Sequence, residues 1–174
     1  MTSQYTSLVA ELVAAVQGDA FWESRLAPLA DDTPPAFALH LGIFVEPYLQ
    51  YILDGLKTVE SRFSTRRLAP YHHVGPGDVL LLKQASGPIV GLCHIAHVWF
   101  YQLDPQSWQT IRASFAQALC AQDPEFWAAR AHASFATLMR IQHVQAIPPI
   151  TYQKRDRRGW VVLRPATEQL ELSL

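Results

Sequence analysis

The pattern of apolar positions divides the chain into a helical N-terminal part and a longer part dominated by strands. Apolar residues recur at three- and four-residue spacings from Ser3 to Val16, and Gly18 follows them, so we expect an amphipathic helix there. A second helical piece starts at Asp19, and the stiff polar stretch 31–35 then interrupts the pattern. These breaks predict a helical appendage with its linker at residues 1–35 and a second, strand-rich domain at 36–174.

From residue 36 onward the pattern alternates between extended and helical stretches. A short helix is predicted between Pro47, a good first-turn residue, and Gly55, which can stop it. Two more helices are predicted where Asp104 and Asp123 are each followed by a proline, which is an N-cap residue before a first-turn residue. Strands are expected at 41–45, 58–64, 79–84, 89–100, 137–147 and 160–164, with 151–154 pairing with 160–164 across the turn 155–159. The fold class is therefore α+β.

Composition narrows the picture to one soluble domain. The chain has 174 residues with 49% apolar content, enough for a single core. It has no apolar run long enough to span a bilayer and no N-terminal leader pattern, so we expect a cytoplasmic protein that does not enter membranes. Cys93 and Cys120 form neither a disulfide framework nor a spaced metal motif, and we interpret both as buried small apolar residues.

The net charge of −1 conceals a segregation of charges along the chain. Residues 1–50 carry six acids and one base, whereas 57–67 and 154–158 each carry four bases and one acid. If the fold brings the two basic segments together, they form a positive patch that attracts phosphates. If it keeps them apart, they are two solvated turns.

The segment from Gly55 to Arg62 concentrates candidate chemistry. Its period-two pattern from Thr58 places Glu60 and Arg62 on one face of a strand, and Lys57 at the junction can swing over that face. We therefore predict that a cation holds Glu60. The alternative is that Lys57 complements a helix end and the other two charges form an ordinary solvated strand face.

The spacing Gly55-x-Lys57-x-x-Glu60-x-Arg62, after an extended segment and a proline-initiated helix, resembles the signature of the ASCH family within the PUA-like superfamily. The resemblance runs from about His40 to Arg164 and leaves out roughly the first 35 residues. It implies a small β-barrel of about five or six strands with inserted helices. It also implies a cleft beside the signature strand and association with RNA or a nucleotide-like ligand.

In a binding protein, Lys57 and Arg62 would contact phosphates or carbonyls, and Glu60 would accept from a base amine or fix the two cations. Further candidate ligand-binding residues lie in the predicted turns. These are Lys83 and Ser86 at one strand end, and Tyr152, Lys154, Arg155 and Arg158 around the basic turn, where an aromatic beside arginines suits base stacking. Lys83 as an edge-strand charge and Ser86 as a turn former are the simpler interpretations.

The same resemblance leaves an enzyme open, because some family members are similar to amidohydrolases acting on acylated cytidine and others to ribonucleases. In the amidohydrolase-like members a threonine, thought to be the nucleophile, stands where this chain has Glu60. Lys57 and Glu60 are then the candidate catalytic residues, with Glu60 as a base toward water and Lys57 polarising a carbonyl. A third class, an interaction adaptor, depends on the N-terminal helices, whose apolar stripe must be covered by the barrel or by a second copy in a homodimer.

Metal and cofactor chemistry find no support in the pattern. His94 and His97 lie on a predicted strand and point to opposite faces, so we expect no metal site there. His72 and His73 lie in a loop that could rim a site. The chain has no nucleophile elbow, phosphate-binding loop or dinucleotide turn, so we expect no cofactor.

Overall fold

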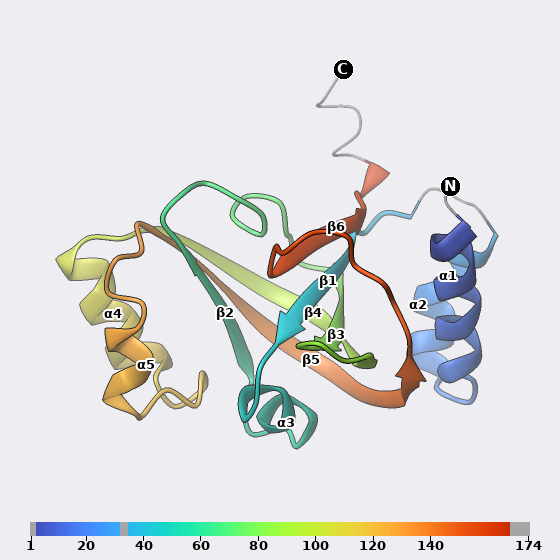
Figure 1. Cartoon of the computed structure of the whole chain (residues 1–174), viewed down its shortest axis with the longest axis horizontal. Helices are drawn as coiled ribbons and strands as arrows, with labels where there is room; N and C mark the ends of the chain where they lie inside the picture. Colours follow the sequence, from blue (N-terminus) through green and yellow to red (C-terminus); the bar gives the residue numbers. More distant parts are fainter. Residues whose placement is uncertain (1–2, 32–34, 168–174) are drawn as a thin grey trace.

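A computed structural model describes residues 3–31 and 35–167, and its elements form one curled sheet with helices at both ends (Figure 1). Most of the predicted connector 31–35 and the last seven residues lie outside the described residues. The strands are β1 (Leu39–Phe44), β2 (Val59–Ser64), β3 (Val79–Gln84), β4 (Ile89–Gln102), β5 (Phe135–Ile150) and β6 (Trp160–Arg164). The helices are α1 (Ser3–Ala15), α2 (Ala20–Ala30), α3 (Tyr48–Leu53), α4 (Pro105–Phe115) and α5 (Pro124–Ala128).

The six strands form a half-barrel in the order β2-β5-β4-β3-β1-β6. β1 and β3 pair in parallel, and the other neighbours pair antiparallel. Register shifts interrupt the long β4–β5 ladder near Ile89, Leu92 and Ile95, and such bulges bend and twist strands. The result is the α+β, PUA-like fold expected from the sequence, with β2 and β6 at its two edges.

Helix ends follow the capping chemistry expected from the sequence. Asp104 accepts from the Ser107 backbone N–H, and the Ser107 hydroxyl lies 2.8 Å from the Asp104 N–H, which completes a capping box for α4. Asp123 accepts from Glu125 N at the start of α5, and Asp19 accepts from Trp22 N at the start of α2. These caps supply partners for N–H groups that the first helical turn cannot pair internally.

The predicted pairing of 151–154 with 160–164 is wrong. β6 instead pairs antiparallel with β1, where Gly42 lies opposite Trp160 and His40 opposite Val162. The open edge of β1 offers a full ladder to β6, and this pairing buries Trp160 to 3% exposure next to His40. Burial of this large side chain outweighs the local preference for a hairpin.

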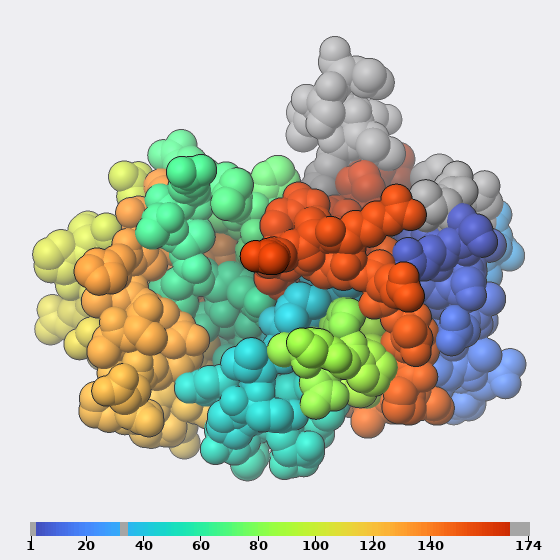
Figure 2. Space-filling model, viewed as in Figure 1, coloured from blue at the N-terminus to red at the C-terminus, as the bar shows by residue number. Residues whose placement is uncertain are grey.

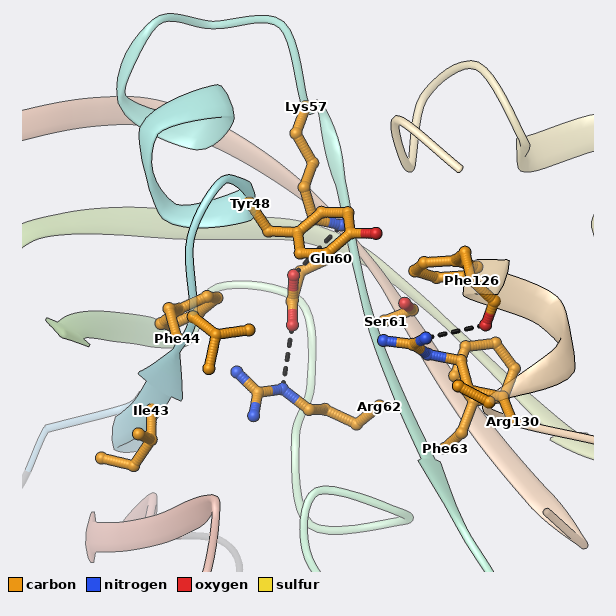
Figure 3. Close-up of a pocket in the computed structure, with 12 residues that line it drawn as sticks. Ile43, Phe44, Tyr48, Lys57, Glu60, Ser61, Arg62, Phe63, Phe126 and Arg130 are labelled. Carbon is orange, nitrogen blue, oxygen red and sulfur yellow. Dashed lines mark hydrogen bonds and ion pairs between the residues drawn. The ribbon is translucent and has the colours of Figure 1, made fainter. Parts of the chain in front are cut away.

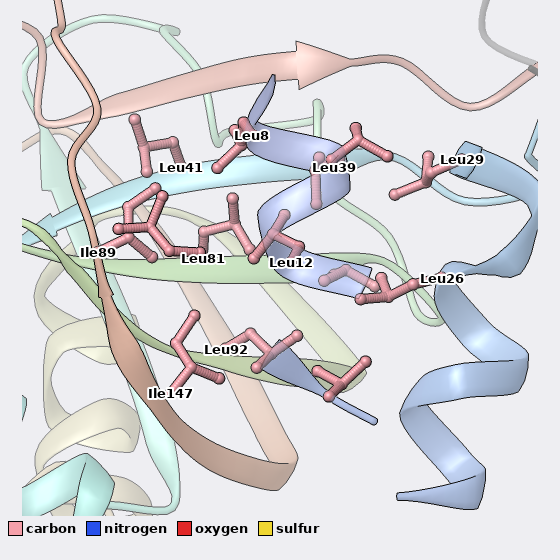
Figure 4. Close-up of a cluster of buried hydrophobic side chains, with 14 of the residues drawn as sticks. Leu8, Leu12, Leu26, Leu29, Leu39, Leu41, Leu81, Ile89, Leu92 and Ile147 are labelled. Carbon is pink, nitrogen blue, oxygen red and sulfur yellow. The ribbon is translucent and has the colours of Figure 1, made fainter. Parts of the chain in front are cut away.

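The N-terminal helices cover one face of the half-barrel. Leu8 and Leu12 of α1 and Leu26 of α2 join Leu81 and Ile147 of the sheet in one buried cluster (Figure 4). Of the two arrangements considered, the stripe packs on the sheet of its own chain. Covering it does not require a second copy, and both the homodimer and the domain boundary at residue 35 stay predictions.

The α2 helix is also fixed by polar and aromatic contacts. The Phe21 ring stacks on His143 with ring centroids 3.8 Å apart, and Trp22 Nε1 donates to the His143 carbonyl at 3.1 Å. Arg25 donates to the Gly77 carbonyl and lies over the Phe37 ring. These contacts anchor the helical appendage to β5 and to the loops before β1 and β3.

A buried polar chain joins β1, β3 and β6. Trp160 Nε1 lies 3.2 Å from His40 Nδ1, and because an indole N–H can only donate, Nδ1 must accept. The His40 proton therefore sits on Nε2, which lies 2.9 Å from an oxygen of Asp78. The Asp78 carboxylate also accepts from the backbone N–H groups of Ala38 and Gly75.

Both cysteines are free thiols. Cys93 is buried in β4, where burial raises the pKa of its thiol, as expected for an inert core residue. Cys120 is half-buried in the turn after α4 rather than within a helix. None of the helices in the described part of the chain has the length and apolar content needed to cross a membrane.

Asp78→Asn should destabilise the fold by about 2–4 kcal/mol. The Asp78 carboxylate accepts from three donors, whereas the NH2 group of asparagine cannot accept, so at least one of these donors loses its partner. Urea unfolding monitored by tryptophan fluorescence measures this. Asp54→Asn is the matched control, since Asp54 is exposed at the end of α3, and it should change the free energy of unfolding by less than about 0.5 kcal/mol. Equal effects of the two changes would contradict the assigned role of Asp78.

Mild acid should loosen the contact between α2 and the sheet. Burial is the main cause that lowers the pKa of His94; nearby Arg25 and His143 add to it, and Asp78 opposes it. The unfolded chain therefore binds a proton at His94 at higher pH than the folded chain does. Stability should be full well above the ordinary histidine pKa of about 6.5 and should fall as pH drops below it.

Thermal unfolding between pH 7.5 and 5 tests this dependence. His94→Gln should flatten the fall in Tm, whereas His97→Gln, on the same strand but exposed, should leave it as in the wild type. If the two variants show the same pH profile, His94 is not responsible.

Candidate functional site

A cleft of about 380 Å³ opens at the seam of the half-barrel, between the end of β1, α3, β2 and α5 (Figure 3). The seam exists because β2 and β6 are the two edges of the sheet and do not pair with each other. We call this cavity the Glu60 cleft. Its wall includes Phe44, Tyr48, Lys57, Glu60, Arg62 and Arg130.

Glu60 is held by two cations at the base of the cleft. Lys57 Nζ lies 3.2 Å from one carboxylate oxygen, and Arg62 Nε lies 2.9 Å from the other. Lys57 is 3% exposed and Glu60 5% exposed, so both charges are almost withdrawn from water. The prediction that a cation holds Glu60 is confirmed. The alternative of an ordinary solvated strand face is wrong for Glu60, because its side chain is almost fully buried.

Local sequence explains how Lys57 reaches Glu60. Gly55 takes a positive φ of 75° directly after α3, and the N–H groups of Leu56 and Lys57 both donate to the Tyr51 carbonyl. This turn brings Lys57 to the start of β2, where its Nζ also donates to the Val59 carbonyl at 2.6 Å.

Burial dominates the electrostatics of the cleft. Desolvation lowers the pKa of Lys57, and the ion pair with Glu60 partly opposes this. Desolvation likewise lowers the pKa of Arg130, with Tyr48 and Glu60 opposing it. An isolated buried carboxylate would be costly, and the ion pairs with the two cations offset the burial of Glu60.

Arg62 connects the two edges of the half-barrel. Its Nη1 donates to the Gly159 carbonyl at 3.1 Å, just before β6, while its own backbone belongs to β2. The guanidinium lies 4.7 Å from the Phe44 ring centroid and 5.3 Å from that of Trp160. A Cβ on Gly42 would lie 3.2 Å from Arg62 Nη2 and 2.8 Å from Phe44, so glycine at this position permits the close approach.

The opposite wall of the cleft comes from α5 and the turn after it, and was not predicted. Arg130 Nη1 donates to the Phe126 carbonyl at 2.7 Å, and its guanidinium lies 3.7 Å from the Phe126 ring centroid. Tyr48 packs against the same ring, with centroids 5.8 Å apart. Arg130 lies in the turn that follows α5, four residues after Phe126, and no sequence signal placed this segment opposite β2.

A second cleft of about 300 Å³ lies on the other side of Arg62, and we call it the Arg158 cleft. Its wall includes Leu68, Pro70, Arg158 and Trp160, and it shares Arg62 and Phe63 with the Glu60 cleft. In Figure 2 the green segment after β2 lies between the orange α5 region and the red loop before β6. The fold thus brings part of each basic segment to one side of the barrel.

Within the 154–158 segment the charges are partly paired. Asp156 accepts from Arg158 Nε at 2.9 Å and from Lys154 Nζ. These donors hold the pKa of Asp156 far below its usual range. Arg155 is exposed and lines neither cleft.

The remaining candidates from the sequence lie elsewhere. Ser86 holds a positive φ of 58° in the turn after β3, which agrees with its interpretation as a turn former. The interpretation of Lys83 as an edge-strand charge is wrong, because β3 lies between β4 and β1 and the Lys83 side chain is 8% exposed and donates to the Gly87 carbonyl. Tyr152 packs against the N-terminal core. None of the three lines either cleft.

The histidines are also dispersed. His72 packs on Phe100, with ring centroids 4.4 Å apart, and lies outside both clefts. His94 contacts Phe21 of α2, whereas His97 contacts Trp99. Across residues 3–31 and 35–167 there is no group of three or more histidine, cysteine or acidic side chains that could hold a metal ion.

Comparison with solved structures supports the fold. An ASCH protein from Zymomonas mobilis matches with a TM-score of 0.59 at 15% identity, covering 79% of this chain and 95% of that one. A tyrosine-to-phenylalanine variant of it matches at 0.58 and 14% identity, covering 79% and 98%, and a serine-to-alanine variant at 0.59 and 15%, covering 80% and 97%. No curated protein gives a significant match.

The ASCH domain model matches residues 43–160, which is most of the chain and includes the whole of the Lys57, Glu60 and Arg62 motif. The N-terminal helices lie outside the matched region. By this match, and with the same fold in the solved structures, the chain belongs to the ASCH domain family.

Proposed function

We propose that this protein binds RNA or a nucleotide-like ligand in the Glu60 cleft. The observation that carries the proposal is a cleft that combines three cations, one carboxylate and an aromatic wall. Lys57, Arg62 and Arg130 outweigh Glu60 in charge, which favours an anionic ligand. The aromatic side chains of Tyr48 and Phe126 suit a flat base.

The burial of each residue indicates whether it positions other side chains or contacts the ligand. Lys57 and Glu60 are almost closed off, so they fix the position of Arg62 more than they touch a ligand. The Arg62 side chain is 20% exposed, and Tyr48 and Arg130 are half-buried. These side chains would make the direct contacts, the arginines to phosphate oxygens and Tyr48 to a base.

Hydrolysis of acylated cytidine or RNA is the second candidate. The observation that favours it is the lowered pKa of Lys57 beside a buried carboxylate in a cleft, a combination that active sites often use. Against it, each oxygen of Glu60 already faces one cation, which leaves the carboxylate poorly available to activate water. We therefore favour binding.

Arg62→Ala and Arg130→Ala should each weaken RNA binding by about 1–3 kcal/mol through loss of a charge-assisted contact. Fluorescence anisotropy with a labelled single-stranded RNA pool measures this, and wild-type affinity should fall steeply with added salt as counterions are released. Arg112→Ala on α4 is the matched control, since Arg112 is exposed and lines neither cleft. Absence of binding to any RNA at low salt would refute the proposal.

Glu60→Gln separates the two candidate functions. For a binding protein, the wild type should show no turnover of acylated cytidine or RNA in a chromatographic assay. For a hydrolase, wild-type turnover should be measurable and Glu60→Gln should abolish it while ligand affinity stays within about threefold, because the amide keeps the shape and loses the basicity. Turnover that depends on Glu60 would overturn the binding proposal.

A further inference from the structure

We propose that the Glu60 cleft and the Arg158 cleft hold two consecutive nucleotides of one RNA strand, with the phosphate that links them at Arg62. This inference rests on the proposed function and extends it from a nucleotide-like ligand to a single strand of at least two nucleotides. It assigns the Arg158 cleft as a second subsite. The observation behind it is that the two cavities share Arg62 and Phe63 along their common border.

Arg62 is built to present a fixed cation at that border. Its Nε is held by Glu60 on the side of the first cleft, and its Nη1 is held by the Gly159 carbonyl at the second. The rings of Phe44 and Trp160 lie against the guanidinium. Within residues 3–31 and 35–167, Nη2 has no hydrogen-bond partner, so its two N–H groups remain available for a phosphodiester oxygen.

The Arg158 cleft has the chemistry of a site for a base and its phosphate. Leu68, which is 58% exposed, and Pro70 supply an apolar wall against which the flat face of a base can lie. Arg158 stands at the rim with its side chain 70% exposed. Its Nε and Nη2 bind Asp156, and within the described residues its Nη1 has no hydrogen-bond partner and can reach a phosphate. The cleft therefore pairs an apolar surface with a positive rim.

The order of these features matches a nucleic-acid strand better than other polymers. Along the surface an aromatic cleft is followed by a fixed cation and then by an apolar cleft with a second cation. RNA repeats a flat base and an anion in the same alternation, whereas a neutral peptide has no anion to place at Arg62. A duplex cannot enter, because its bases are stacked and paired and cannot be splayed into separate pockets.

Ligand length is the first test. We would measure the affinity of the full chain for a nucleoside monophosphate, a dinucleotide and a tetranucleotide of single-stranded RNA by calorimetry at low salt. The dinucleotide should bind about tenfold or more tightly than the monophosphate, the gain expected from one additional base contact. Equal affinities for the monophosphate and the dinucleotide would overturn the inference and leave the proposed function intact.

Substitutions in the Arg158 cleft test whether the additional affinity for the dinucleotide arises there. Arg158→Ala and Leu68→Glu should weaken dinucleotide binding at least about fivefold and leave monophosphate binding within about twofold. Arg157→Ala is the control for lost charge in the same turn, and Leu56→Glu is the control for the added acid, because Leu56 is 61% exposed and lines neither cleft. All four positions are exposed, so the variants should fold, and their melting curves verify this.

Each outcome is decisive. If Leu68→Glu weakens both ligands equally, the second cleft is not a separate subsite and the inference fails. If the protein prefers duplex RNA or an acidic peptide of the same charge, the single-strand assignment fails. If neither monophosphate nor dinucleotide binds, the proposed function falls and this inference falls with it.

Discussion

The open seam of the half-barrel is the constraint on which the candidate site depends. Backbone pairing joins neighbouring strands but leaves β2 and β6 as edges, and the Arg62 side chain links them from β2 to the Gly159 carbonyl. The same guanidinium pairs with Glu60 and lies against Phe44 and Trp160. A single charged side chain spans the seam where a backbone ladder would have closed it. The fold therefore keeps two cavities beside a fixed cation.

Holding that cation in place requires charges that burial alone would disfavour. Lys57 and Glu60 are both nearly buried, and a buried ion pair contributes little net stability because desolvation offsets attraction. Their retention in the seam is better explained by position than by stability. Glu60 sets where Arg62 lies, and Lys57 supplies the second cation that pairs with Glu60.

A continuous set of contacts runs from the N-terminal helices to this seam. Arg25 of α2 binds the Gly77 carbonyl, and the next residue, Asp78, contacts His40, which contacts Trp160. Trp160 in turn lies under Arg62. The helical appendage lies outside the matched ASCH region, yet it packs on the strands that position the site. The two helices lie at the opposite end of the sheet from α4 and α5 (Figure 1).

The sequence by itself determined the elements, their caps and the shared face of Glu60 and Arg62, because periodicity and capping act between residues close along the chain. The Gly55 to Arg62 spacing also identified the family. Only the tertiary structure decided that β6 pairs with β1, that Arg130 and Phe126 face β2, and that Lys83 and Tyr152 lie away from the cleft. These are contacts between distant segments, fixed by which pairing buries the most apolar surface and satisfies the strand edges, and no local pattern encodes that choice.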